Sequence, residues 1–267
     1  MISPAAAVQR ELWGGDPRAW AEHAEAHNRP LFEALLDATG VASGTRLLDV
    51  GCGTGLALVL AGERGAQLTG IDVTPGLLAV ARERLPAADL REMEMEDLPF
   101  ADDSFDVAIG VNSFQFAGEP VRALREAARV VAPGGLVAAS LFAAPERSQS
   151  TVVHHAMAAL SPPAAASDHA PFALSAPGNL EAALSAAGLE LGAQGEVGCS
   201  WRYATIDDAV RGLLCSAGGA RAIRDAGEPR VRQTLLEAMR QFEDPATGIV
   251  NTDNVFRWVL ARRPLSS

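Results

Sequence analysis

The sequence predicts an α/β fold in which helices cover both faces of a doubly wound, mostly parallel sheet. One observation is the alternation of short apolar segments with helical patterns from about residue 45 to residue 142, which is typical of consecutive β-α-β units. The other is LLDVGCGTG at residues 47–55, an apolar strand that runs into three glycines at alternate positions and then into a helix. A strand, a glycine turn and a helix in this order form the first unit of a nucleotide-binding α/β fold.

The elements of the first half follow in order along the chain. Residues 8–40 are predicted to be helical, because their leucines and tryptophans are spaced to form apolar faces. Thr74-Pro75 indicates a helix start, and Pro133-Gly134-Gly135 indicates the end of a helix and a turn into the next strand. The predicted strands lie at 46–50, 66–71, 89–94, 105–111 and 135–142, and the predicted helices between them at 54–64, 75–85 and 119–132.

The composition changes after Phe142. Residues 143–177 are rich in Ala, Ser and Pro and are predicted to form a flexible covering segment with one helix at 150–160. Beyond it we expect helices at 178–187, 206–226 and 228–243, and strands at 189–203 and 255–261. The predicted division is a helical cap at 1–44, a ligand-binding core at 45–142, a lid or substrate segment at 143–177, and the rest of the sheet at 178–267 with a helical insertion at 206–243.

Length and charge limit the possible partners. The chain has 267 residues, of which 48% are hydrophobic, and a formal net charge of −11. Nucleic-acid binding needs concentrated Lys and Arg, so this charge argues against a nucleic-acid partner and disfavours an anionic membrane surface. We therefore expect a small-molecule substrate and a protein that is a monomer or a homodimer.

The cysteines and the amino terminus predict the compartment. Cys52, Cys199 and Cys215 have no paired or metal-ligand spacing, and no Cys/His/Asp cluster has the spacing of a zinc site, so no metal is expected. The first residues, MISPAAAVQRELWGG, lack the basic and apolar regions of a signal peptide. A cytoplasmic protein without a membrane anchor is the resulting expectation.

The glycine turn narrows the choice of ligand. A dinucleotide fingerprint would place a glycine where Leu56 stands, and a phosphate-binding P-loop would require a Lys that this turn lacks. A second acid, Asp72, ends the next strand seventeen residues after Gly55, where a carboxylate can accept hydrogen bonds from both hydroxyls of a ribose. A glycine turn alone can be a simple strand-to-helix connection, but its pairing with Asp72 favours an adenosine ligand.

The turn and three further segments resemble the class I S-adenosylmethionine-dependent methyltransferases. The segments are GID at 70–72, EDLPFADDSFDVAIG at 96–110 and LREAARVVAPGGLVAAS at 124–140. The resemblance covers the core from 45 to 142, and the later part shares only a general pattern with small-molecule methyltransferases. It implies a seven-stranded, Rossmann-like sheet whose last two strands form an antiparallel hairpin, with the final strand beside the fifth.

The resemblance also implies roles for individual residues. Asp49 would hold the amino group of S-adenosylmethionine, Asp72 would bind the ribose and Val73 would pack on the adenine. Glu94 matches the acid near the adenine amino group, although the family usually has Asp there, and Met95 is larger than the usual small residue. The remaining implied cofactor contacts are Gly51, Gly53 and Gly55 in the turn, Gly110 at the tip of the fourth strand, and Trp20 over the methionine end.

Methyl transfer from a sulfonium is an in-line displacement, so holding two reactants aligned supplies much of the catalysis. A hydroxyl acceptor needs a general base as well, whereas an amine, a thiol or an activated carbon need not. His169, beside Asp168, is the favoured base, with Asn112 and Gln115 as uncharged groups that could orient the acceptor. His23, His27, His154 and His155 are the other histidines considered.

The predicted function is methylation of a small molecule, a natural-product intermediate of secondary metabolism, with S-adenosylhomocysteine as the second product. Two alternatives keep the same fold and the same cofactor. In one, the bound cofactor is structural and the pocket catalyses a cyclisation or a decarboxylation. In the other, the protein is a cofactor-binding regulator without chemistry. The glycines and Asp72 do not discriminate among the three, because all of them need the cofactor.

Overall fold

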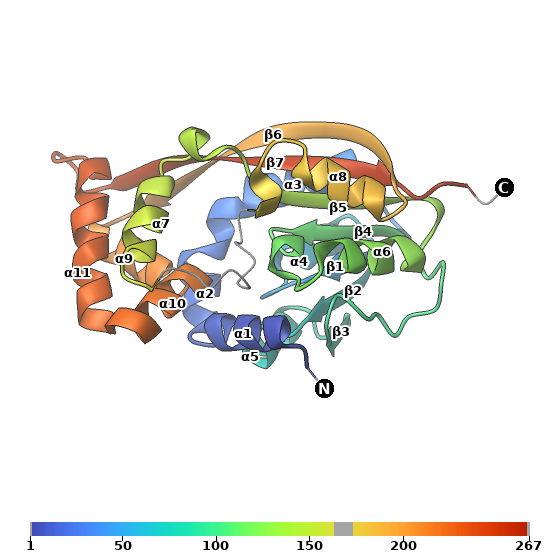
Figure 1. Cartoon of the computed structure of the whole chain (residues 1–267), viewed down its shortest axis with the longest axis horizontal. Coiled ribbons are helices and arrows are strands. Elements are labelled where there is room, and N and C mark those ends of the chain that lie inside the picture. Colours follow the sequence, from blue (N-terminus) through green and yellow to red (C-terminus); the bar gives the residue numbers. More distant parts are fainter. Residues whose placement is uncertain (1, 163–172, 266–267) are drawn as a thin grey trace.

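The computed structural model describes residues 2–162 and 173–265. In this part of the chain, seven strands form one sheet in the order β3-β2-β1-β4-β5-β7-β6 (Figure 1). The strands are β1 Arg46–Val50, β2 Gln67–Asp72, β3 Asp89–Glu92, β4 Phe105–Val111, β5 Val131–Phe142, β6 Glu190–Tyr203 and β7 Val250–Arg262. β7 alone runs against its neighbours, pairing antiparallel with β5 and with β6. The predicted fold class, including the antiparallel last strand beside the fifth, is confirmed.

The helices lie on both faces of this sheet and at one end of it. The α-helices are α1 Pro4–Trp13, α2 Pro17–His23, α3 Arg29–Ala38, α4 Leu56–Glu63, α5 Pro75–Arg84, α6 Pro120–Val130, α7 Thr151–Ala158, α8 Asn179–Ala186, α9 Ile206–Leu214, α10 Ala217–Ala226 and α11 Glu228–Met239. The 3-10 turns are η1 Glu25–Asn28, η2 Phe114–Phe116, η3 Pro145–Arg147, η4 Ala173–Ser175 and η5 Arg240–Phe242. None of the described helices is long and apolar enough to span a bilayer.

The central strands are buried on both faces, as parallel strands between two helical layers must be. β1 shows this directly, because Leu47 belongs to the cluster under α3, α4 and α5, whereas Leu48 and Val50 belong to the cluster under α6 and α8. Successive side chains of a strand point to opposite faces, so one apolar run of the sequence supplies both cores.

Several predicted boundaries are wrong, each for a local reason. The helix predicted over 206–226 is two helices, because Ser216 starts α10 by accepting a hydrogen bond from the Gly219 N–H at 3.1 Å. The fifth strand begins at Val131 rather than 135, with an irregularity around Gly134, whose φ is +79°. The helical region 8–40 is divided into α1, α2, η1 and α3 and begins earlier, at Pro4. The last strand begins at Val250 rather than 255.

The early start of β7 shapes the molecule. β7 pairs with β5 only over 256–262, and among the seven strands residues 250–255 pair with β6 alone. Because Phe142 at the carboxyl end of β5 faces Phe256, the far half of the β6–β7 hairpin projects beyond the carboxyl edge of the parallel strands. Helices α7, α9, α10 and α11 gather around this projection (Figure 1) and bury a third apolar cluster that includes Met157, Val210 and Leu235. We call these four helices the cap from here on; the N-terminal helices of residues 1–44 are not part of it.

Candidate functional site

The glycine turn sits at the carboxyl edge of the sheet, between β1 and α4. The backbone N–H groups of Gly51 and Cys52 both donate to the carbonyl of Ile71, at 2.9 and 2.8 Å, which fastens the turn to β2. Gly51, Gly53 and Gly55 have φ values of +78°, +55° and +86°, a left-handed conformation that strains any residue with a Cβ. The backbone therefore favours glycine at all three positions before any ligand is considered.

The three glycines nevertheless face different surroundings. A Cβ on Gly51 would lie 2.6 Å from the Cβ of Ser113, and one on Gly55 would lie 3.2 Å from the Cβ of Ala81. A Cβ on Gly53 would meet nothing within 4 Å. Gly51 and Gly55 thus permit close packing within the protein, and Gly53 leaves open backbone that a ligand can approach.

Asp72 joins the second strand to the turn. Its Oδ2 accepts the Gly53 N–H at 2.9 Å and its Oδ1 accepts the Thr74 N–H at 2.8 Å. Burial raises the pKa of this carboxyl group, and the hydrogen bonds from Thr74 and Gly53 act in the opposite direction. Each carboxylate oxygen has a further lone pair, so Asp72 can hold the turn and still accept bonds from ribose hydroxyls.

Asp49 is 2% exposed and lies where β1 enters the turn. Burial raises its pKa to about 8, and the negative charges of Asp72 and Glu25 add to the effect. A buried carboxylate with like charges around it is stabilised by a cation. The charge at this point therefore fits the ammonium group of a ligand.

Glu25 is the residue that sequence reasoning missed. It lies in η1, is 4% exposed, and its Oε1 accepts the N–H of Leu56, the first residue of α4, at 3.3 Å. Its Oε2 pairs with Arg84 at 2.5 Å, and Arg84 also donates to the carbonyl of Thr54 at 3.0 Å. No local pattern could have identified Glu25, because its partners lie thirty-one and fifty-nine residues further along the chain.

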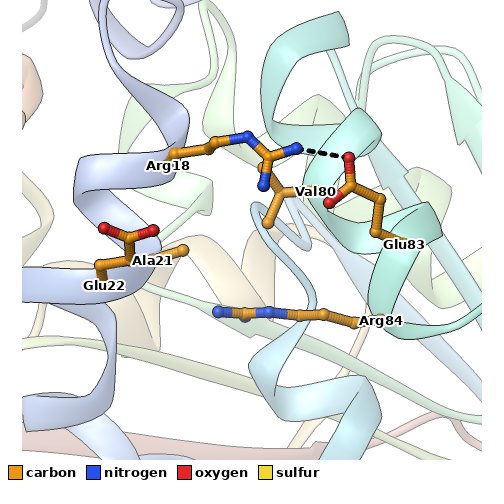
Figure 2. Close-up of a pocket in the computed structure, with 6 residues that line it drawn as sticks. All are labelled: Arg18, Ala21, Glu22, Val80, Glu83 and Arg84. Carbon is orange, nitrogen blue, oxygen red and sulfur yellow. Dashed lines mark hydrogen bonds and ion pairs between the residues drawn. The ribbon is translucent and has the colours of Figure 1, made fainter.

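Arg84 also lines a hollow between α2 and α5, drawn in Figure 2. There Arg18 of α2 reaches across to Glu83 of α5, with 2.6 Å between the charged groups. The N-terminal helices are thus fixed to α5 close to the residue that holds the turn.

The tip of the fourth strand gathers neutral polar atoms. Asn112 has a φ of +53°, and its N–H donates to the Ser140 carbonyl at 3.1 Å. Among the described residues, no hydrogen-bond partner is found for the buried side-chain oxygens of Asn112, Ser113 and Gln115, or for that of Thr54 in the glycine turn. Buried polar atoms are nearly always satisfied in proteins, so these oxygens indicate a ligand with hydrogen-bond donors. The predicted residues Asn112 and Gln115 belong to this group, and Ser113 is an addition to it.

The structure gives the other predicted contacts structural roles of their own. Gly110 is covered by Phe114, whose ring would lie 2.2 Å from an added Cβ, so packing alone explains this glycine. Glu94 accepts the N–H of Ser3 at 2.6 Å and so holds the start of α1. Val73 is half-buried. Met95 packs against the cluster under α6 and α8. Contact of these four residues with a cofactor stays a prediction.

Trp20 belongs to an aromatic group beside the strand tip. Its ring meets Trp13 edge to face, with centroids 4.9 Å apart, and Trp13 meets Phe116 of η2 at 6.1 Å. The N-terminal helices therefore reach the tip of β4, although contact of Trp20 with the methionine end also stays a prediction.

The favoured base, His169, lies outside the described residues. His154 is on α7 and lies edge to face with Phe142 at 5.4 Å, and burial, with a smaller effect of His155, lowers its pKa to about 4. The Nε2 of His27 lies 3.0 Å from the carbonyl of Arg202, so this nitrogen donates a hydrogen bond to it. Neither histidine is brought into a described contact with Asn112 or Gln115.

Comparison with known proteins supports this picture. Residues 48–139 match the family model described as a methyltransferase domain. The malonyl-[acyl-carrier protein] O-methyltransferase of Serratia marcescens is 36% identical over 121 residues, 45% of this chain and 48% of that protein. The chain thus spans about half the length of the curated relatives it matches.

Two solved structures share the fold over most of the chain. The [4+2]-cyclase SpnF is 24% identical with a TM-score of 0.58, covering 97% of this chain and 93% of that one. A methyltransferase candidate from Bacillus halodurans is 18% identical with a TM-score of 0.59, covering 87% and 98%. The sheet order, the glycine turn, the strand-end acids and the family model agree, and residues 48–139 form part of a class I S-adenosylmethionine-dependent methyltransferase domain.

Proposed function

We propose that this protein transfers a methyl group from S-adenosylmethionine to a small molecule, a natural-product intermediate. The observation that carries the proposal is the combination of open backbone at Gly53 with the buried, uncompensated acid Asp49. Such a site suits a ligand that brings a positive charge to the turn, and a phosphate would be repelled from it. The bound cofactor would supply an electrophilic methyl group on its sulfonium.

The chain's own residues would bind and orient. Asp72 would accept hydrogen bonds from the ribose hydroxyls while it still accepts the Gly53 N–H. One side chain would therefore position both the cofactor and the turn. Asp49 would accept the ammonium group. Both interactions leave the methyl-donating end free to face the tip of β4, which is the region of the unsatisfied oxygens.

Asn112 and Gln115 would orient the acceptor through those oxygens. They carry no charge, so they would position a donor group of the acceptor without removing its proton. Alignment of the two reactants is then the main catalytic contribution of the protein. For a hydroxyl acceptor we propose His169 as the base, tested by comparing pH–rate profiles of the wild type and His169→Asn: loss of the limb near pH 6–7 supports the role.

The cap supports a small acceptor rather than a macromolecule. The projecting hairpin and the cap helices stand beyond the carboxyl edge, and α2 packs on α9 while α1 packs on α10. Elements at this edge surround the ligands of open α/β sheets and exclude water from them. The partly exposed rings of Phe142 and Trp201, with centroids 6.2 Å apart, would offer the acceptor an apolar wall.

A second candidate is a cyclisation in which the cofactor is only structural. It is favoured by the similarity to SpnF, a [4+2]-cyclase that shares this fold over nearly the whole chain. The two candidates differ in one product, because only methyl transfer converts S-adenosylmethionine into S-adenosylhomocysteine.

The experiment that separates them uses the purified protein, S-adenosylmethionine and a panel of phenol, amine and polyketide acceptors. Acceptor-dependent formation of S-adenosylhomocysteine supports methyl transfer. Conversion of an acceptor to an isomer of unchanged mass, at equal rates with either form of the cofactor, supports cyclisation. Binding of neither form of the cofactor would overturn both candidates.

A further inference from the structure

The amino end of α4 depends on a residue from elsewhere in the chain. Its N-cap is Gly55, which has no side chain to offer, and its first turn contains no acidic residue. The first N–H groups of a helix have no partner within the helix and attract negative charge. Glu25 supplies the missing acceptor, since its Oε1 takes the N–H of Leu56.

A carboxylate at this point changes what the turn can bind. In the nucleotide-binding folds with a strand, a glycine turn and a helix, the pyrophosphate binds at the amino end of that helix. Glu25 occupies that end with a buried negative charge, so a phosphate would meet both a filled acceptor site and a like charge. With the Glu25 carboxylate at the amino end of α4, this end favours a cationic ligand group over an anionic one.

The surrounding charges are mostly negative. Asp72 and Glu25 both act on the buried Asp49 of the turn, and Arg84, which reaches the turn at the Thr54 carbonyl, is paired with Glu25. Within the same turn, Thr54 is fully buried, and its hydroxyl oxygen has no hydrogen-bond partner among the described residues. The open backbone of Gly53 follows Asp49 and comes shortly before Leu56, whose N–H donates to Glu25, so the same turn is held by two buried acids.

From this we infer that Glu25 is a cofactor-binding residue, which together with Asp49 holds the ammonium group at the methionine end of S-adenosylmethionine. The inference rests on the proposed cofactor and adds a residue from the N-terminal helices to its site. Because Arg84 donates both to Glu25 and to the Thr54 carbonyl, an occupied turn would also strengthen the attachment of η1.

Calorimetry of the full chain with two ligands tests the inference. S-adenosylmethionine has the ammonium group, whereas 5′-methylthioadenosine has the same adenosine and sulfur without the amino-acid end. Glu25→Gln keeps an oxygen that can accept the Leu56 N–H and removes only the charge. We expect it to weaken S-adenosylmethionine binding by about tenfold or more and to leave methylthioadenosine binding unchanged.

Glu33→Gln is the matched control, because Glu33 is an exposed acid of the neighbouring helix α3 paired with Arg29. It should change neither affinity. Equal losses for both ligands in Glu25→Gln would make Glu25 a structural cap only and overturn the inference, and so would the absence of any loss. Failure of the wild type to bind S-adenosylmethionine would overturn the proposed function itself.

A measurement on the wild type keeps the test valid if Glu25→Gln does not fold. Hydrogen exchange of residues 17–38 should be slowed more by saturating S-adenosylmethionine than by saturating methylthioadenosine, because only the first ligand reaches Glu25. Equal protection by the two ligands would contradict the inference.

Discussion

The two ends of the site are built in different ways. The cofactor end uses residues close together in sequence, since the turn from Gly51 to Gly55 is fastened to β2 by backbone hydrogen bonds and by Asp72. The proposed acceptor end is surrounded by α1, α2, the cap and the far half of the β6–β7 hairpin, which come from distant parts of the sequence. In the proposed function, a short motif would bind the methyl donor, and long-range packing would shape the site of the acceptor.

Gly53→Val should break the cofactor end and have the largest effect. A β-branched side chain at a φ of +55° is strained and fills the side from which the ligand approaches, so cofactor affinity should fall by about a hundredfold or more. Gly198→Ala is the matched control in the hairpin, where an added Cβ meets nothing within 4 Å. Unchanged cofactor titration of folded Gly53→Val would mean that the turn is only a connection.

Asp72→Ala should weaken the cofactor by about 1.5–3 kcal/mol, the range for hydrogen bonds that involve a charged group. The loss includes the bond to Gly53, so adenosine alone should be affected as well. Asp89→Ala, at the exposed start of β3, should leave calorimetric affinities as they are. Equal cofactor affinities of the Asp72 and Asp89 variants would contradict the proposal that Asp72 binds the ribose.

Asp49 makes cofactor binding depend on pH. Its pKa of about 8 lies above the ordinary value, so protonated Asp49 stabilises the ligand-free fold below pH 4, and that contribution is lost as the pH rises through 8. A bound ammonium favours the ionised form and lowers the pKa. Cofactor affinity should therefore rise by roughly tenfold per pH unit between pH 6 and 8, with release of a proton.

Proton release is measured by comparing the enthalpy of cofactor binding, by calorimetry, in two buffers of different ionisation enthalpy. Asp49→Asn should bind the cofactor more weakly at pH 8 and show no proton release. A wild-type affinity that is flat between pH 6 and 8 would show that Asp49 does not hold a cation.

Asn112→Gly and Gln115→Leu should have the smallest effect and should act on the acceptor alone. Glycine tolerates the φ of +53° at position 112, so the first variant removes the side chain without straining the backbone. Turnover or acceptor KM should change by roughly two- to tenfold, the value of a neutral hydrogen bond, with cofactor affinity unchanged. A loss of cofactor affinity instead would show that these side-chain oxygens contact the cofactor and not the acceptor.

The sequence by itself determined the strands of the core, the glycine turn and the acids Asp49 and Asp72. These features depend on neighbours in the chain: short apolar runs between helical patterns predict the strands, and a left-handed turn favours glycine whatever surrounds it. The same local rules placed the two polar residues, Asn112 and Gln115, at a strand tip where the structure leaves their side-chain oxygens buried and unsatisfied.

Only the tertiary structure decided that Glu25 caps α4, that Gly51, Gly55 and Gly110 serve internal packing, and that β7 extends far enough to carry the cap. Each depends on a contact between segments far apart in sequence. Glu25 is an ordinary acidic residue of the N-terminal helices until the fold brings it to α4, a helix whose own N-cap has no side chain. Local propensity carries no information about such a contact, because its stabilising energy arises only when both segments are already in place.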